Sequence, residues 1–276
     1  MPDDGDDSSA GIEGAEDCLN LCIYSPEQSP NASSLLPVLV FIPGGCFWMG
    51  GGDTLVYDGQ HMATTGNIVV VTINYRLGAL GFLRTESDVI TGNWGVLDMI
   101  FALEWVRENI AAFGGDPTRV TIDGESSGAT AVATLITSPP VYENNLIAGA
   151  VIQSNPYTAG LLTEGLAEKY GQMFAETVGC AETDITCLRN APLNATIFAE
   201  FKVYQSMLAS INLLLSPLAV TCGWGPIVDG TIVPGECSFV LFARRPFFFF
   251  FFFFFFFFPV ASALAHSPRQ TNRCSR

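Results

Sequence analysis

The sequence predicts an α/β protein whose central sheet is mostly parallel. From about residue 18, short apolar runs rich in β-branched residues alternate with longer segments whose apolar residues recur at helical spacing. This alternation is typical of a parallel sheet flanked by helices. A chain of 276 residues, with 49% hydrophobic and only 14% charged residues, has enough apolar side chains for one substantial core.

Five segments have the length and composition of strands. The run IVVVTIN at residues 68–74 is continuous and rich in β-branched residues, as expected of a buried strand. The predicted strands are residues 19–24, 37–42, 68–74, 120–123 and 147–153.

The clearest helix is predicted over residues 94–113. Its apolar residues at helical spacing are Val96, Ile100, Leu103, Val106 and Ile110. Two glycines follow at 114 and 115 and supply a stop signal. Further helices are predicted at 126–137, 163–178 and 195–209.

The charge balance argues against one class of partner. Twelve Lys and Arg residues against 27 Asp and Glu residues give a formal net charge of −15. Nucleic acids and anionic membrane surfaces are bound through clustered basic side chains, so neither is an expected partner. Part of the acidity lies in residues 1–15, which have too little apolar surface to pack, and we expect this start to be disordered.

Eight cysteines and two N-glycosylation sequons, at Asn31 and Asn194, favour an oxidising compartment and a secreted protein. Residues 1–30 contain no basic segment followed by an apolar one, so we interpret a signal peptide as missing from this chain. The cysteine count alone assigns no pairs, although Cys180 and Cys187 would close a short loop.

A nucleophile elbow is predicted at Gly124-Glu125-Ser126-Ser127-Gly128, hereafter the elbow. The pentapeptide follows a predicted strand and begins a predicted helix, which is the context that a serine nucleophile requires. Its outer glycines, Gly124 and Gly128, permit a tight, strained turn that lifts the hydroxyl of Ser126 above the sheet. A plain strand-to-helix turn is the alternative.

A second glycine-rich turn directly follows the predicted strand at 37–42. We call residues 43–48, Pro-Gly-Gly-Cys-Phe-Trp, the 43–48 loop. Acyl transfer develops negative charge on a carbonyl oxygen, and fixed backbone N–H groups stabilise that charge without reorganising. The expected donors are the amides of Gly45, Cys46 and Ser127. The alternative is a glycine-rich connection without chemical use.

The order of these motifs resembles the type-B carboxylesterase, lipase and cholinesterase family over about residues 16–240. The matching segments are EDCLNL at 16–21, NYRLG at 74–78, GFL at 81–83, GNWGVLD at 92–98, FGGDP at 113–117, the elbow, QS at 153–154 and GPIVDG at 225–230. The resemblance implies an α/β-hydrolase fold, Ser126 as nucleophile, an oxyanion hole of Gly45, Cys46 and Ser127, a disulfide between Cys180 and Cys187, and catalysis without cofactor or metal.

Some positions depart from the family pattern. Cys46 stands where the family usually has a third glycine, although its backbone N–H can still donate. Ser127 replaces the usual alanine, and Asn155 replaces the usual glycine. The family partner of Cys18 lies upstream, and no cysteine precedes Cys18 here.

The other two members of a catalytic triad are not found by sequence. In this fold the order is serine, acid, histidine. Of the two histidines, His61 precedes the nucleophile and is interpreted as a surface residue, while His266 lacks the glycine-flanked setting of the family. Among the acids, Glu125 abuts the serine and cannot reach around it, and Asp184 and Asp229 are interpreted as a helix-region charge and a turn residue.

The last segment breaks the pattern, because residues 247–258 are twelve consecutive phenylalanines followed by proline. A membrane-spanning helix needs ~20 apolar residues, so an anchor is not expected, and a misread coding sequence is our interpretation. The expected organisation is a disordered start at 1–15, a partial carboxylesterase domain at 16–243 that is truncated at both ends, and an anomalous tail at 244–276.

The leading hypothesis is therefore a serine carboxylic ester hydrolase that acts on a small-molecule or lipid ester through an acyl-enzyme at Ser126. We expect the chain itself to be weakly active or inactive, because the acid and histidine are not found. The alternative is a non-catalytic, cholinesterase-like binding or adhesion module. Such relatives usually lose the nucleophile, so the retained Ser126 counts against it.

Overall fold

A computed structural model describes residues 14–26, 34–154, 161–210 and 223–235, with the backbone alone at 207–210, 250–252 and 274–275. Several predictions fall outside these residues. They concern residues 1–13, Asn31, Cys222, Cys237, His266 and most of the phenylalanine run.

The main sheet has seven strands in the order β8-β5-β4-β2-β3-β1-β9. The strands are β1 (Leu21–Tyr24), β2 (Leu36–Ile42), β3 (Val69–Ile73), β4 (Gly115–Glu125), β5 (Gly149–Gln153), β8 (Phe250–Phe252) and β9 (Cys274–Ser275). The pairs from β8 through β5, β4 and β2 to β3 are parallel, whereas β1 runs antiparallel to β3 and to β9. The predicted mostly parallel sheet is confirmed.

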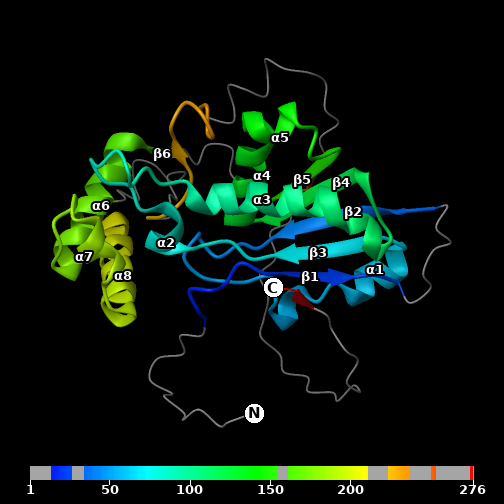
Figure 1. The fold of residues 1–276 in the computed structure, drawn as a ribbon, viewed down its shortest axis with the longest axis horizontal. Helices are drawn as coiled ribbons and strands as arrows, with labels where there is room; N and C mark the ends of the chain where they lie inside the picture. The colour runs from blue at the N-terminus through cyan, green and yellow to red at the C-terminus, as the bar shows by residue number, and fades with distance from the viewer. Residues whose placement is uncertain are drawn as a thin grey trace, which may run out of the picture.

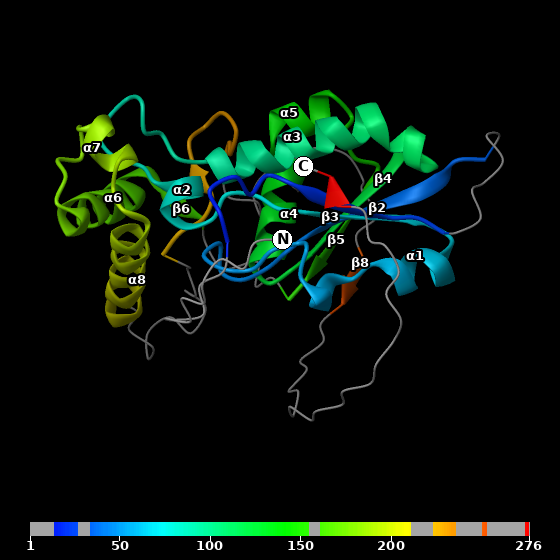
Figure 2. The same cartoon turned by 60° about the horizontal axis from the view of Figure 1, so that its bottom comes forward.

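Helices flank this sheet on both faces. They include α1 (Gln60–Gly66), α3 (Trp94–Asn109), α4 (Ser127–Thr137) and α5 (Pro139–Glu143), with short 3₁₀ turns at η1 (Leu55–Tyr57) and η2 (Ile110–Phe113). Figure 1 and Figure 2 show α3 over one face and α1 beside the other. No helix in the described parts of the chain is long and apolar enough to cross a membrane.

A second group of elements lies beyond the carboxyl ends of the parallel strands, where the arrowheads in Figure 1 point. It comprises α2 (Gly78–Phe82), α6 (Glu164–Val178), α7 (Ile185–Arg189), α8 (Leu193–Ser210) and a small sheet of β6 (Leu162–Thr163) with β7 (Ile227–Val228). The predicted disulfide between Cys180 and Cys187 joins the end of α6 to α7. Cys22 and Cys46 each take part in a disulfide as well.

The core forms where the sheet meets α3 and α4. All five residues of β3 are buried, as expected of an internal strand covered on both faces. The five apolar residues predicted to face the core from residues 94–113 are all buried, and Gly114 ends that segment with a left-handed φ of 84°. Burial of these side chains supplies the main driving force for folding.

The predicted elements are largely confirmed, with shifted ends. The structure divides the predicted helix at 94–113 into α3 and η2, and it starts β4 at Gly115, five residues earlier than predicted. Sequence reasoning missed α1, α2, α5 and α7. Each has only five to seven residues, which is too short for a helical period to be recognised.

Candidate functional site

Ser126 lies in a strained turn between β4 and α4. Its φ of 59° and ψ of −122° are unusual for a residue other than glycine. Its amide donates to the carbonyl oxygen of Gln153 at 3.0 Å, and its own carbonyl accepts from Thr130 at 3.1 Å. The residue is exposed, whereas the next residue, Ser127, is buried. The predicted bend between sheet and helix is therefore present.

The two glycines of the elbow are required by close backbone approach. A Cβ at Gly124 would overlap the backbone of Gly128, and a Cβ at Gly128 would overlap the carbonyl oxygen of Ile42. The start of α4 thus packs directly against the ends of β4 and β2. This packing explains why Ser126 is held in a strained conformation.

Below the serine, Asp123 and Gln153 join β4 to β5. The side-chain amide of Gln153 donates to both carboxylate oxygens of Asp123, at 2.8 and 3.0 Å. Burial raises the pKa of Asp123 above its ordinary value, although these hydrogen bonds oppose the shift. Because the Ser126 amide donates to the Gln153 carbonyl, this pair ties the turn to β5.

The 43–48 loop lies against the elbow, as predicted. Strands β2 and β4 are parallel neighbours with Ile42 opposite Gly124, so the loops that follow them leave the same edge of the sheet. A Cβ built on Gly44 would lie 3.4 Å from the Cβ of Ser126 and 2.6 Å from the carbonyl oxygen of Glu125. The glycine-rich turn and the serine are therefore in direct contact.

Three consecutive residues of this loop have positive φ: Gly45 at 118°, Cys46 at 59° and Phe47 at 56°. Two of them carry side chains, and each such residue costs about 1–3 kcal/mol of strain. The turn closes when the amides of Trp48 and Met49 donate to the carbonyl oxygen of Gly45, at 3.1 and 3.0 Å. Among the described residues, the Gly45 amide itself donates to no acceptor.

Contacts from distant segments hold the strained loop. The amide of Phe47 donates to the Ser127 hydroxyl at 3.4 Å, and the carbonyl of Phe47 accepts from Gly78 at 2.7 Å. The hydroxyl of Tyr75 donates to the carbonyl oxygen of Pro43 at 2.9 Å. Burial raises the pKa of Tyr75, so this hydroxyl stays protonated and remains a donor.

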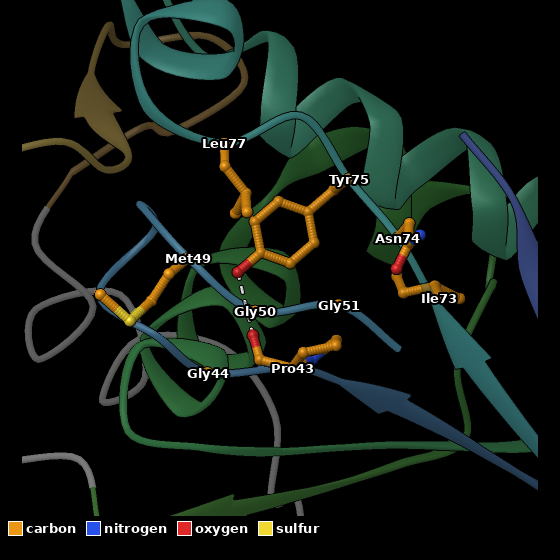
Figure 3. A pocket seen from close by; sticks show the side chains of 9 residues that line it. All are labelled: Pro43, Gly44, Met49, Gly50, Gly51, Ile73, Asn74, Tyr75 and Leu77. Carbon is orange, nitrogen blue, oxygen red and sulfur yellow. Dashed lines mark hydrogen bonds between the residues drawn. The ribbon is translucent and has the colours of Figure 1, made fainter. Parts of the chain in front are cut away.

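A small pocket adjoins the loop on the side of β3 (Figure 3). Its lining comes from the segment that follows β2 and from the end of β3 with the segment after it, namely Pro43, Gly44, Met49, Gly50, Gly51, Ile73, Asn74, Tyr75 and Leu77. Figure 3 shows the Tyr75 hydroxyl directed at the Pro43 carbonyl beside it. Ser126 is not part of the lining.

Several motif residues serve as ties between segments. Arg76 forms a bidentate pair with the buried carboxylate of Asp98, with both contacts at 2.7 Å. Asn93 exchanges two hydrogen bonds of 2.8 Å with the backbone of Ile227 and donates to Asp229 at 2.9 Å. These contacts join the segments at 74–78, 92–98 and 225–230.

Three of the acid and histidine candidates, Asp184, Asp229 and His61, have the structural settings that the sequence indicated. The carboxylate of Asp229 accepts from the amides of Thr231 and Val233 within a turn, and Asp184 caps the start of α7. His61 is exposed on α1, which lies beside the end of the sheet where β3 begins (Figure 1). Ser126 is at the opposite, carboxyl edge, so the described residues bring no histidine to it.

Sequence reasoning missed a buried carboxylate next to the site. Glu200 of α8 accepts from the Ala79 amide at 2.7 Å and from the indole N–H of Trp48 at 3.2 Å. Burial raises its pKa to about 7, while these two hydrogen bonds oppose the shift. A single glutamate within a helical segment gives no sequence signal of such a role.

Comparison with known proteins identifies the family. A model described as "Carboxylesterase family" matches residues 2–245. The chain belongs to the carboxylesterase family. Carboxylesterase relatives include the cAMP-regulated D2 protein of Dictyostelium discoideum, 41% identical over 224 residues, or 81% of this chain and 39% of that protein. Human bile salt-activated lipase is 37% identical over 233 residues, or 81% of this chain and 30% of the lipase.

Solved structures agree with the carboxylesterase assignment. A structure titled PNB esterase superposes with a TM-score of 0.71 at 31% identity, covering 84% of this chain and 47% of that one. A thermophilic PNB esterase superposes with a TM-score of 0.70 at 32% identity, covering 82% and 44%. The fold is the α/β-hydrolase fold, and the chain spans less than half the length of these relatives.

Proposed function

We propose that the chain carries the nucleophile and the oxyanion loop of a serine carboxylic ester hydrolase. The observation that carries the proposal is the exposed, strained Ser126 in direct contact with the glycine-rich turn at Gly44. Strained backbone conformations cost free energy, persist only where the surrounding structure enforces them, and cluster at active sites. The names of the matched esterases and lipase support a small-molecule or lipid ester as substrate.

In the proposed reaction, the Ser126 oxygen attacks the ester carbonyl carbon and the carbonyl oxygen becomes an oxyanion. The amides of Gly45, Cys46 and Ser127 are the proposed donors to it. The Gly45 amide donates to no acceptor among the residues that the structure describes, which supports this role. The position of Ser127 at the start of α4, where an amide has no intrahelical acceptor, supports it too. The carbon–oxygen bond to the alcohol then breaks, the alcohol leaves with a proton, and water hydrolyses the acyl-enzyme.

Attack by Ser126 requires a base that accepts its proton, and a histidine usually fills this role. The chain has two histidines, of which the described one, His61, lies on α1 away from the elbow. Loss of the base from such a triad lowers the rate by about 10⁴ to 10⁶. We therefore propose that the isolated chain reacts slowly at Ser126.

A fluorophosphonate probe tests this proposal, because it forms a stable bond to an activated serine with release of fluoride. We expect slow modification of Ser126, faster modification when imidazole is added as a substitute base, and none in Ser126→Ala. An exposed serine far from the site provides a matched control, so Ser25→Ala should label like the wild type. Labelling that persists in Ser126→Ala would refute the assignment of Ser126 as the nucleophile. Rapid labelling without imidazole would refute the proposal that Ser126 has no base.

We further propose that the protein is secreted and glycosylated. The Cys180–Cys187 disulfide and the exposed Asn194 of the sequon in the first turn of α8 support this. Peptide mapping of the secreted product, with and without glycosidase, should give a mass change of the peptide containing Asn194.

The retained Ser126 argues against the alternative function, a non-catalytic binding module.

A further inference from the structure

The 43–48 loop meets α8 through a cluster of aromatic rings around one carboxylate. The indole of Trp48 stacks on Tyr204 with centroids 5.6 Å apart and an interplanar angle of 14°, and on Phe201 at 6.1 Å and 27°. Its N–H donates to Glu200 Oε2 at 3.2 Å. The last residue of the loop is therefore fixed in orientation by a helix that is more than 150 positions away in the sequence.

The second oxygen of Glu200 is equally committed. Oε1 accepts from the Ala79 amide in the first turn of α2 at 2.7 Å. The next residue back, Gly78, has a φ of +54°, and a Cβ there would overlap the Glu200 carboxylate. Gly78 also donates to the carbonyl oxygen of Phe47 at 2.7 Å. Glu200 thus contacts the loop directly through Trp48 and indirectly through α2.

We propose that Glu200 is a positioning residue that holds the 43–48 loop in its left-handed conformation against the elbow, by accepting hydrogen bonds from the Trp48 indole and the Ala79 amide. The inference rests on the proposed function in so far as the loop supplies oxyanion donors. The ionised carboxylate is the stronger acceptor, because charge-assisted hydrogen bonds are about twice as strong as neutral ones. A protonated Glu200 therefore holds the loop less firmly.

The surroundings of Glu200 make this anchor sensitive to pH near neutrality, as its pKa of about 7 indicates. Neither α2 nor the 43–48 loop has a charged side chain. On α6, Glu164 and Glu168 both pair with Arg84, and on α8 the Lys202 ammonium lies over the Phe198 ring. The remaining charges of α6 are Lys169 and Glu176. Within the described parts of the chain, no ion pair includes Glu200.

Nuclear magnetic resonance of the tryptophan indoles tests the anchor without requiring enzymatic activity. The chain has four tryptophans, so ¹⁵N-tryptophan labelling gives four indole signals, and Trp48→Phe identifies the relevant one. We expect the Trp48 N–H signal to move downfield with a single midpoint near pH 7 as Glu200 ionises. Glu200→Gln should abolish this titration, whereas Glu143→Gln, an exposed glutamate on α5, should leave it unchanged.

A Trp48 signal that does not titrate in the wild type overturns the proposal, and so does a titration that persists in Glu200→Gln. The wild-type titration alone can refute it, so the proposal remains testable if Glu200→Gln fails to fold. The three other indole signals report whether the variant is folded.

The second readout is the rate at which the fluorophosphonate modifies Ser126 in the presence of imidazole. We expect the ratio of the wild-type rate to the Glu200→Gln rate to rise about tenfold between pH 5.5 and 8.5, as the wild-type loop becomes anchored. A ratio that does not vary with pH refutes the link from Glu200 to the oxyanion loop. If the wild type is not labelled at all, the proposed function fails, while the indole titration still decides whether Glu200 anchors Trp48.

Discussion

The elbow and the 43–48 loop both hold residues other than glycine at positive φ, but by different means. At the elbow the constraint is local, since Gly124 and Gly128 let the start of α4 pack on the strand before it. In the loop, Cys46 and Phe47 are strained, and the contacts that hold the loop reach distant segments. Phe47 donates to Ser127, 80 positions away, and the neighbouring Trp48 donates to Glu200, 152 positions away. Strain at the elbow is therefore built into a short motif, whereas strain in the loop depends on the completed tertiary structure.

The largest expected effect comes from Gly124→Ala. The new Cβ would overlap the backbone of Gly128, which cannot move without separating α4 from β4. We expect a loss of at least about 4 kcal/mol in the free energy of unfolding, measured by urea denaturation. Gly165→Ala is the matched control, because nothing lies within 4 Å of a Cβ at that helical position. This variant should gain about 0.5–1 kcal/mol. Equal stability of the two variants would contradict the local constraint.

The next effect tests how the loop is held. Phe47 is 3% exposed and packs edge-on against Phe82 at 5.2 Å and Tyr75 at 6.4 Å. Phe47→Ala should cost about 3 kcal/mol, because it leaves a cavity while the backbone strain remains. Met49→Ala, at an exposed position of the same turn, should cost less than about 0.5 kcal/mol. Similar losses would show that the loop is not held by its buried ring.

The comparison explains which parts of the site were predictable. The serine, the two elbow glycines and the buried strands could be predicted, because their determinants lie within a few neighbouring residues. The sequence also indicated the glycine-rich turn as the source of oxyanion donors, because it directly follows a predicted strand. Its contact with the elbow follows from the pairing of β2 with β4, which only the structure shows. The sequence carried no sign of Glu200, since a glutamate in an amphipathic helix is ordinary and its burial depends on how α8 packs against α2.

The pH dependence of stability provides a third test of the contacts that hold the loop. The pKa of Glu200 rises from 4.5 to about 7 on folding, so the folded state binds more protons than the unfolded state between these values. The free energy of unfolding should therefore fall as pH rises from 4.5 to 7, by about 1.4 kcal/mol per unit from this group. Burial also raises the pKa of Asp123, which adds a term of the same sign.

Glu200→Gln should reduce this slope without removing it, because Asp123 remains. Denaturation at pH 5 and pH 8 measures the difference between the two slopes. An unchanged slope would contradict a raised pKa for the buried carboxyl of Glu200. At pH 8 we expect Glu200→Gln to be more stable than the wild type, and we expect its Ser126 to be modified more slowly. Such a combination would mean that ionised Glu200 destabilises the fold while holding the loop in place.

The smallest effect concerns Ser126 itself. Its φ of 59° and ψ of −122° suit glycine better than any residue with a side chain. Ser126→Gly should therefore raise the free energy of unfolding by about 1 kcal/mol while abolishing fluorophosphonate labelling. Ser126→Ala keeps the Cβ and the strain, so it should lose labelling without the gain in stability. If both variants had wild-type stability, the turn would store no strain, and the contrast with the 43–48 loop would rest on the loop alone.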